Sequence, residues 1–295
     1  MGDHDRIHAL PCWNGAIEIA SLQGGLSNAN YLVRDAHGQH VVRFGVDYPF
    51  HHVFREREVM VSRAAHAAGF APEVQYADTG VTVTQFIAAR TYNGGDVRGN
   101  AARIGTLLRR FHAEMPRQIT GAGFLFWVFH VIRDYAATLR GANSGAVSSL
   151  PKLLQEADAF EALQVPLPII YGHNDLLPGN FLDDGEKLWL IDFEYAGFNT
   201  AMFDLAGAAS NALMTDDEAM ELLVSYFGSK PQADVIRSFD AMQCASLSRE
   251  LLWSHVSALY LNAPGVDYAA YAAENQSRYE VALDRYQSAH GKLLT

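Results

Sequence analysis

A polar segment in the second half of the chain combines the residue types that phosphoryl transfer requires. It runs Tyr171-Gly172-His173-Asn174-Asp175-Leu176-Leu177-Pro178-Gly179-Asn180, and Leu188-Trp189-Leu190-Ile191-Asp192 follows. A carboxylate can accept the proton of a substrate hydroxyl, and carboxylate and amide oxygens are ligands that suit magnesium. We therefore expect Asp175 to be the catalytic base and Asn180 and Asp192 to bind magnesium. The alternative is a turn in which Asp and Asn side chains only cap the backbone.

A glycine-rich segment near the N-terminus has the composition of a phosphate-binding loop. Gly24 and Gly25 allow backbone N–H groups to approach phosphate oxygens, and Ser27 and Asn28 add hydrogen-bond donors. The segment is neither the P-loop lysine motif nor the dinucleotide fingerprint. Taken alone, such a segment is more often a hairpin turn than a nucleotide clamp. Its meaning therefore depends on the segments that follow it.

A nucleotide site also needs a cation beside the phosphates and a carboxylate that holds the cation. Arg43 lies in the apolar run Val41–Phe44, and a buried arginine requires a charged partner. Glu56 and Glu58, in the helix expected over Arg55–Ala68, are the candidate partners. The alternative for these charges is an exposed pair on a solvated surface, which stabilises little.

The elements that position these residues fall into two groups. In the first third, turn residues between short β-branched and aromatic runs predict strands at Ala16–Gln23, Ala29–Asp35, His40–Phe44, Val74–Tyr76 and Val81–Phe86. From about Asn100 a helical period predicts helices at Ala101–Met115, Phe126–Leu139, Ser148–Leu163, Thr215–Phe227, Pro231–Leu261 and Tyr268–His290. Two short strands, Ile169–Gly172 and Leu188–Ile191, flank the polar segment. The pattern predicts an α+β fold with domains at residues 1–88 and 89–295.

In order and residue type, these segments resemble the choline/ethanolamine kinase family, of a bacterial type and akin to aminoglycoside phosphotransferases. The resemblance rests on His173-Asn174-Asp175, Asn180 and Ile191-Asp192-Phe193-Glu194-Tyr195, and it continues through Phe203-Asp204-Leu205. It implies a protein kinase-like, two-lobed fold, with an antiparallel sheet lobe before a mainly helical lobe. It also implies that Asp175 is the base, that Asn180 and Asp192 bind magnesium, and that His173 and Asp204 brace the loop. Glu194 is a candidate for contact with substrate or metal, and a structural hydrogen bond is the alternative.

The same resemblance assigns the nucleotide site to the N-terminal domain. The glycine-rich segment corresponds to the nucleotide loop, and Arg43 stands where protein kinases have lysine, as is frequent in choline kinase-like proteins. The family spacing favours Glu58 over Glu56 as its partner. Gln85 and Ile87 lie in the segment that resembles the hinge, which offers backbone groups to the nucleobase.

The C-terminal helices are the expected acceptor site. Trp253 and Tyr271 lie in segments that resemble the aromatic walls around a quaternary ammonium, although helical aromatics also pack as plain core. Two positions depart from the better-known choline enzymes. Glu250 stands where a second tryptophan is expected, and Asn211 stands at an acidic position. The expected acceptor site therefore keeps a carboxylate but has fewer aromatic residues around the cation. This makes a primary amine or a larger cation plausible as the substrate.

We therefore expect an ATP- and Mg²⁺-dependent phosphotransferase that acts on the hydroxyl of a small cationic alcohol, with choline or ethanolamine as first choice. Alternatives are a kinase of thiamine, an aminoglycoside or a sugar, and a non-catalytic nucleotide-binding protein on a kinase fold. The net charge of -11 argues against nucleic acid bound at a basic face. Without a long apolar run, a secretory signal pattern or a disulfide framework, we expect a cytoplasmic protein with no membrane partner. Whether the protein forms a homodimer, and whether it uses GTP in place of ATP, are questions that stay open.

Overall fold

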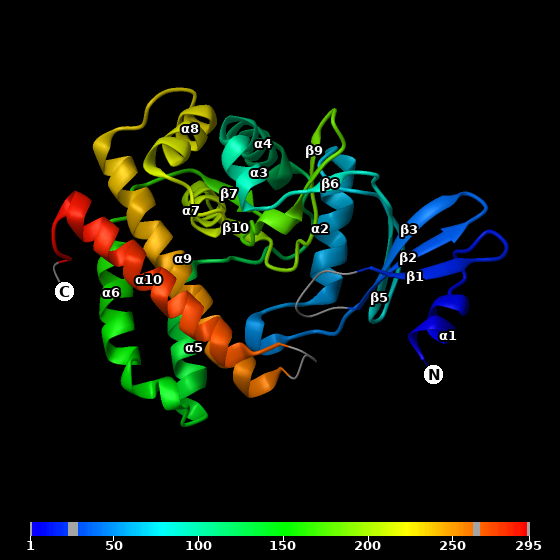
Figure 1. The fold of residues 1–295 in the computed structure, drawn as a ribbon, viewed down its shortest axis with the longest axis horizontal. Coiled ribbons are helices and arrows are strands. Elements are labelled where there is room, and N and C mark those ends of the chain that lie inside the picture. The colour runs from blue at the N-terminus through cyan, green and yellow to red at the C-terminus, as the bar shows by residue number, and fades with distance from the viewer. Residues whose placement is uncertain (1, 23–28, 262–265, 294–295) are drawn as a thin grey trace. The chain divides into compact units, whose positions relative to one another are not determined.

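The computed structural model describes residues 2–22, 29–261 and 266–293, and over these the chain divides into two compact units. The first unit consists of Met1–Thr91 and Asn180–Glu194, and the second consists of Tyr92–Gly179 and Tyr195–Thr295. Figure 1 shows the strands gathered in the first unit and the long helices in the second. An α+β chain with strands first and helices later is what the sequence predicts.

In the part that the structure describes, the first unit is built around a five-stranded antiparallel sheet in the order β1-β2-β3-β5-β4. The strands are β1 (Glu18–Leu22), β2 (Ala29–Asp35), β3 (Gly38–Phe44), β4 (Val74–Asp78) and β5 (Val81–Gln85). Val42 and Phe44 of β3 are buried in a core that includes Ile7 of the short helix α1 (Asp3–His8). Because successive side chains of a strand point to opposite faces, Arg43 projects from the face opposite this core.

A smaller sheet joins residues Asn180–Glu194, which come late in the sequence, to the first unit. Its strands, in the order β6-β8-β9, are β6 (Arg90–Thr91), β8 (Phe181–Asp183) and β9 (Leu188–Leu190). The N–H of Leu190 also donates to the carbonyl of Phe70 at 2.8 Å, just beyond α2 (Arg55–Ala67). This division differs from the predicted boundary at residues 88 and 89, which assumed two contiguous domains. Strand pairing, which joins residues far apart in sequence, is the reason.

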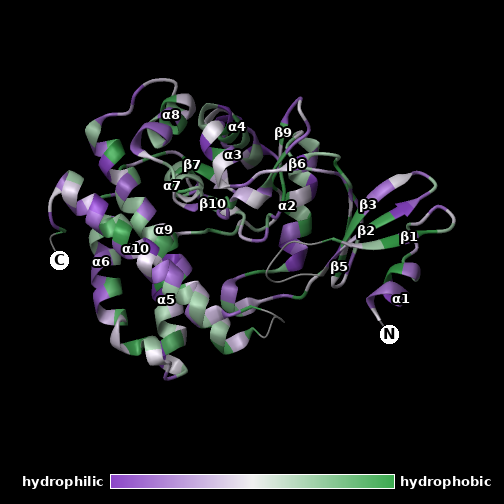
Figure 2. Ribbon diagram, viewed as in Figure 1, coloured by the Kyte–Doolittle hydropathy of each residue, from purple (hydrophilic) through white to green (hydrophobic). Residues whose placement is uncertain are grey.

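The described residues of the second unit are mainly helical and include one strand pair. Its helices are α3 (Gly94–Gly99), α4 (Ala101–Glu114), α5 (Val128–Gly141), α6 (Leu150–Ala162), α7 (Ala201–Asn211), α8 (Asp216–Phe227), α9 (Ala233–Tyr260) and α10 (Tyr268–His290). The strands β7 (Ile169–Gly172) and β10 (Gly197–Thr200) pair antiparallel. Helix α9 packs against α5, α7 and α10 (Figure 1). Polar and apolar segments alternate along α6 and α10 (Figure 2), as expected of helices with one buried face.

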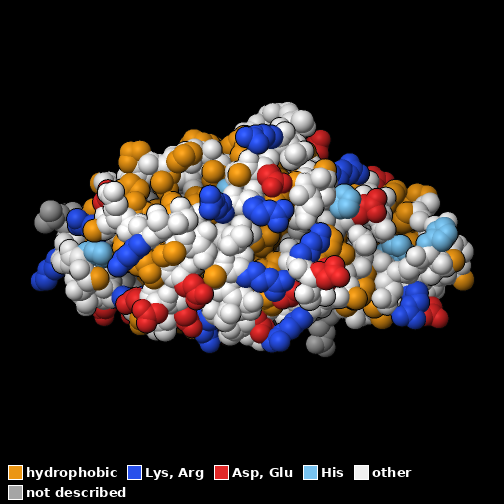
Figure 3. All heavy atoms as spheres, turned by 90° about the horizontal axis from the view of Figure 1, so that it is seen from above, with side chains coloured by type: hydrophobic (Ala, Val, Ile, Leu, Met, Phe, Trp, Pro, Cys, Tyr) orange, Lys and Arg blue, Asp and Glu red, His pale blue; other side chains and the backbone are white. Residues whose placement is uncertain are grey.

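The surface and the helices give two further observations. On the face drawn in Figure 3, acidic and basic side chains lie interspersed among apolar ones. Among the described residues, no helix combines the length and the apolar content needed to cross a membrane.

Candidate active site

The loop that carries Asp175 begins where β7 ends, and a single buried carboxylate holds it. Asp204, in the first turn of α7, accepts the backbone N–H of His173 on Oδ2 and that of Asn174 on Oδ1, each at 2.7 Å. Each oxygen of the carboxylate therefore fixes one peptide of the loop. Asp175, the next residue, is only half-buried. The carboxylate of Asp175 therefore follows two residues whose backbone N–H groups are held by Asp204.

Asp204 is in turn held by a histidine that the sequence analysis did not identify. Nε2 of His112 lies 2.8 Å from Oδ2 of Asp204, and Nδ1 of His112 lies 2.9 Å from the hydroxyl of Tyr226. Burial alone would raise the pKa of Asp204, but the hydrogen bond from His112 and the charges of His112 and His173 outweigh it and lower the pKa. Asp204 is therefore held ionised, the form that accepts both backbone bonds.

Asn174 links the loop to the β7–β10 pair. Its Nδ2 donates to the carbonyls of Tyr195 at 3.1 Å and Gly197 at 3.3 Å, and its Oδ1 accepts from Asn199 at 2.9 Å. Its backbone has φ of 62°, in the left-handed region that few residues other than glycine adopt. Such conformations cluster at functional sites, where surrounding contacts impose them. Here these hydrogen bonds impose the turn just before Asp175.

Gly172 is required where it stands because side chains crowd it. A Cβ at this position would lie 2.8 Å from Oδ1 of Asn174 and 3.1 Å from Oδ2 of Asp204. Gly172→Ala is therefore expected to lower the free energy of unfolding by about 1–3 kcal/mol, as overpacking does. The measurement is urea unfolding. Gly141→Ala is the control, because a Cβ at Gly141 meets open space. Equal stability of the two variants would contradict this account.

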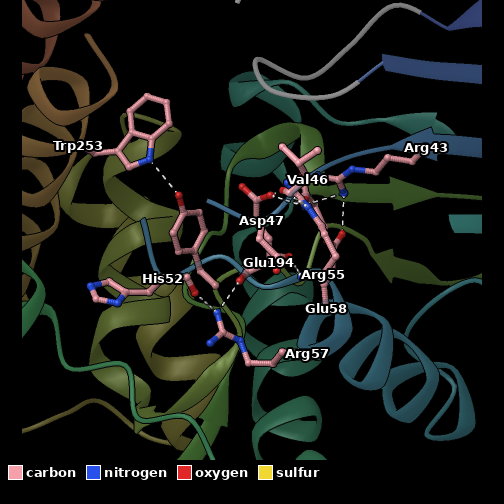
Figure 4. Close-up of polar contacts among 11 residues, drawn as sticks. Arg43, Val46, Asp47, His52, Arg55, Arg57, Glu58, Glu194 and Trp253 are labelled. Carbon is pink, nitrogen blue, oxygen red and sulfur yellow. Dashed lines mark hydrogen bonds and ion pairs between the residues drawn. The ribbon is translucent and has the colours of Figure 1, made fainter. Parts of the chain in front are cut away.

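The aromatic residues predicted for the acceptor site meet in the second unit. Nε1 of Trp253 donates to the hydroxyl of Tyr195 at 2.9 Å (Figure 4). The rings of Trp253 and Tyr271 lie 5.9 Å apart at 83°, and Tyr268 lies 6.5 Å from Trp253. Burial raises the pKa of Tyr271, and the charges of Glu250 and Asp175 raise it further. Tyr271 is thus within electrostatic reach of both Glu250 and Asp175.

Glu250, expected as a carboxylate available to an ammonium, is already paired. Nη1 of Arg249 donates to Oε1 of Glu250 in a short ion pair. Arg249 is only 2% exposed, and its Cζ lies 4.4 Å from the centroid of the Tyr195 ring. The sequence analysis did not identify Arg249. A charged residue in the apolar stripe of a helix was the one available signal.

The first unit gathers an ionic cluster around Arg43 (Figure 4). Nη1 of Arg43 donates to Oε1 of Glu58 at 2.9 Å and to Oδ1 of Asp192 at 2.8 Å. Its Nη2 donates to Oε2 of Glu194 at 3.3 Å. The predicted pairing of Arg43 with Glu58 is confirmed, whereas Glu56 is exposed.

A second arginine, missed from the sequence, completes this cluster. Nη1 of Arg55 donates to Oε2 of Glu58 at 2.6 Å and to Oε2 of Glu194 at 3.0 Å. Burial and the charge of Asp192 raise the pKa of Glu194 to about 7, against the lowering effect of Arg43 and Arg55. The hydrogen bonds from Arg43 and Arg55 to Glu194 are of the structural kind that was the alternative, while contact with substrate or metal stays a prediction. The i, i+3 spacing of Arg55 and Glu58 was the available signal.

The donor set around Asp192 fits a magnesium ion. Asn180 ends a short 3-10 turn (Pro178–Asn180), and its carbonyl accepts the N–H of Ile191 at 3.1 Å, which brings it beside Asp192. Asp192 has φ of 68°, and its carboxylate can accept from Arg43 and still ligate a cation, since each oxygen has two lone pairs. Arg43 and Arg55 balance the charges of Glu58 and Asp192, and Glu194, with a pKa of about 7, is only partly ionised at neutral pH. The carboxylate oxygens of Asp192 and the amide oxygen of Asn180 are hard ligands of the kind that magnesium prefers.

The remaining predicted nucleotide residues are only partly described. Gly24, Gly25, Ser27 and Asn28 lie outside the described residues. Gln85 ends β5, and its N–H donates to the carbonyl of Glu73 at 2.9 Å. That N–H is therefore committed to the sheet and is not a donor for a nucleobase. Ile87 follows the strand, in an irregular segment.

Comparisons with known proteins agree with this geometry. Residues 18–233 match the profile of a family described as "Phosphotransferase enzyme family". A probable ethanolamine kinase of Arabidopsis thaliana is 34% identical over 166 residues, which cover 51% of this chain and 43% of that protein. Protein LicA of Haemophilus influenzae is 26% identical over 219 residues, which cover 72% of this chain and 63% of LicA. The match thus spans between two fifths and two thirds of these relatives.

A solved structure matches over nearly the whole chain. The choline/ethanolamine kinase family protein of Mesorhizobium loti superposes with a TM-score of 0.78 at 28% identity, covering 98% of both chains. This agreement confirms the protein kinase-like fold class expected from the sequence.

Proposed function

We propose, since this chain belongs to the phosphotransferase enzyme family, that it is an ATP- and Mg²⁺-dependent phosphotransferase. Its acceptor is the hydroxyl of a small cationic alcohol, with choline and ethanolamine as first candidates. The observation that carries the proposal is the position of Asp175 on a loop immobilised by Asp204, within electrostatic reach of Tyr271. The named activities of the relatives support the same acceptor class.

In this proposal Asp175 accepts the proton of the acceptor hydroxyl as the phosphoryl group is transferred. A general base must lie within hydrogen-bond reach of that proton, which requires a fixed loop. His173 contributes its backbone N–H to Asp204 and is itself fully buried, so it serves as a structural residue rather than as the base. Asp204 orients the loop without touching the acceptor.

The nucleotide is assigned to the first unit. Magnesium, when bound, neutralises charge on the phosphates, and Asn180 and Asp192 are the residues that would hold it. Arg43, oriented by Glu58, is assigned to the phosphates. Backbone groups of the glycine-rich segment and of Ile87 are assigned to the phosphates and the nucleobase.

The acceptor cation is assigned to the aromatic faces of Trp253 and Tyr271. Each cation–π contact contributes about 0.5–2 kcal/mol. Trp253→Leu is therefore expected to raise the KM for choline by about 2- to 30-fold, since 1.4 kcal/mol is tenfold. The KM for ATP should stay unchanged.

Trp127→Leu provides the matched control for this test. Trp127 lies in the same unit and also donates one indole hydrogen bond, to Oε1 of Glu161 at 2.6 Å. Loss of one tryptophan and one hydrogen bond is thus common to both variants. An equal rise in the KM for choline in both would remove Trp253 from the acceptor site.

One observation favours a second acceptor class. The carboxylate of Glu250 is paired with the buried Arg249, which reduces its attraction for a cation. A neutral or less cationic alcohol, such as a sugar, then competes. The deciding experiment measures ADP release with choline, ethanolamine, thiamine, an aminoglycoside, a sugar and water alone. Faster ADP release with choline or ethanolamine than with the other acceptors supports the proposal. ADP release that no acceptor raises above the rate with water alone would contradict it.

A further inference from the structure

A cavity lies within the helical unit, between the end of α7, the middle of α9 and the later half of α10. Its volume is about 250 Å³, slightly below the range typical of drug-sized ligands. The residues that line it include neither Asp175 nor Glu250, Trp253 or Tyr271. The cavity is thus distinct from the acceptor site and suits a small molecule.

Two arginines give one wall of this cavity a positive charge. Arg278 and Arg285 are one heptad apart, so they lie on the same face of α10. Nη2 of Arg278 donates to the carbonyl of Ser210 at 3.1 Å, and Nη1 of Arg285 donates to that of Met214 at 3.4 Å. Because carbonyls carry no net charge, these bonds leave the positive charge in place. Arg285 also contacts Asp216, whose side chain is 84% exposed, so that solvent screens the pair.

The acidic residue of the cavity is occupied by other partners. Asp240 on α9 accepts from Nε2 of His290 at 2.7 Å and from Nε2 of Gln243 at 3.1 Å. These hydrogen bonds leave its charge in place, but among the lining residues the two arginines outnumber this one carboxylate. The polar lining therefore carries a net positive charge, which favours an anion.

Much of the remaining lining is apolar. It includes Leu213, Met214, Leu247 and Val281, of which Leu213 is 67% and Val281 66% exposed. Leu213 has φ of 54°, the left-handed conformation of a helix end, and here it lies just past the end of α7, where the N–H of Met214 donates to the carbonyl of Ala209 at 3.0 Å. An apolar ligand body would cover these side chains.

A chain of hydrogen bonds joins this cavity to the catalytic loop. Nη2 of Arg278 also donates to Oδ1 of Asn211 at 3.4 Å, and Nδ2 of Asn211 donates to the carbonyl of Leu176 at 3.3 Å. Leu176 follows Asp175 directly. An anion that binds Arg278 would compete for these bonds and so alter the support of the loop.

We propose that this cavity is a regulatory site for a small amphiphilic anion, a carboxylate or a phosphate monoester with an apolar body. The anionic group binds Arg278 and Arg285, and the apolar body packs against Leu213, Leu247 and Val281. Binding is coupled to the acceptor site through Asn211. Couplings between sites are typically about 5- to 150-fold in affinity, and we expect a change in the acceptor KM at the lower end of that range.

Calorimetric titration of the full chain with hexanoate, hexyl phosphate and hexanol tests the site. Adding ADP and magnesium in excess keeps the phosphate probe from the nucleotide site. We expect at least one anion to bind at least tenfold more tightly than hexanol, and comparison of the two anions identifies the head group. Equal binding of hexanol, or no binding of either anion, would overturn the proposal.

Variants locate the binding and separate it from catalysis. Arg285→Gln removes charge away from the catalytic loop, and Ala282→Phe fills the cavity while keeping both arginines. Each should weaken binding of the favoured anion at least tenfold, whereas Arg140→Gln, at an exposed position of α5, should not. Unchanged affinity in Ala282→Phe would place the anion elsewhere. The anion should change the acceptor KM in wild type but not in Asn211→Ala, and an anion that binds without that change would refute the regulatory role.

Discussion

Replacing Asp175 by asparagine is expected to lower kcat by about 10²- to 10⁴-fold, the range that general-base assistance contributes. Asparagine has nearly the same shape as aspartate, but its amide cannot take up the acceptor proton. The residue is half-buried and its loop is held by backbone N–H bonds to Asp204, which the substitution leaves in place. Nucleotide affinity should therefore stay within about twofold, because the assigned nucleotide residues belong to the other unit.

The measurements are steady-state ADP release with the best acceptor and an independent nucleotide titration. Asp158→Asn is the control. Asp158 lies in the same unit, and its side chain is 63% exposed in an ion pair with Arg133. Urea unfolding of both variants shows that each is folded. Turnover close to wild type in a folded Asp175→Asn would refute its assignment as the base.

Replacing Asp192 by alanine is expected to raise the magnesium concentration needed for half-maximal activity more than tenfold, and more than Asn180→Ala does. A carboxylate brings a full negative charge to a hard cation, whereas an amide brings only a dipole. Asp192 also accepts from Arg43 at 2.8 Å, and in its absence Arg43 keeps its hydrogen bonds to Glu58 and Glu194.

Direct magnesium titration by calorimetry, in the presence of ADP, checks this without relying on turnover. Glu56→Ala removes an exposed carboxylate from the same unit and should leave the magnesium affinity unchanged. A larger metal requirement in Asn180→Ala than in Asp192→Ala would mean that the two roles are reversed.

Patterns that repeat over a few residues made much of the fold predictable. The predicted strand Ala29–Asp35 has the observed bounds of β2, and α10 has the observed bounds Tyr268–His290. Alternation along β3 buries Val42 and Phe44, which places Arg43 on the other face and requires a partner for it. These features depend on local periodicity, which a sequence displays directly.

Elements without such a pattern were missed. Helix α7, Ala201–Asn211, is buried on nearly all sides and therefore shows no polar face from which a helical period can be recognised. The strands β6, β8 and β10, unlike the equally short β7 and β9, lack a continuous apolar run that would mark them. The two strands that flank the polar segment were predicted, but β7 pairs with β10 and β9 with β8.

The sequence by itself determined the order of strands and helices, the residue types of the polar segment and the need of Arg43 for a glutamate. Tertiary structure alone decided which distant groups meet. His112 reaches Asp204 across 92 positions, and Arg43 reaches Asp192 across 149. Glu250 and Arg249 are adjacent in sequence, yet only the tertiary packing buries Arg249. The physical reason is that a buried charge takes whichever partner the packing of distant elements brings to it, and local spacing encodes only near pairs such as Arg55 with Glu58.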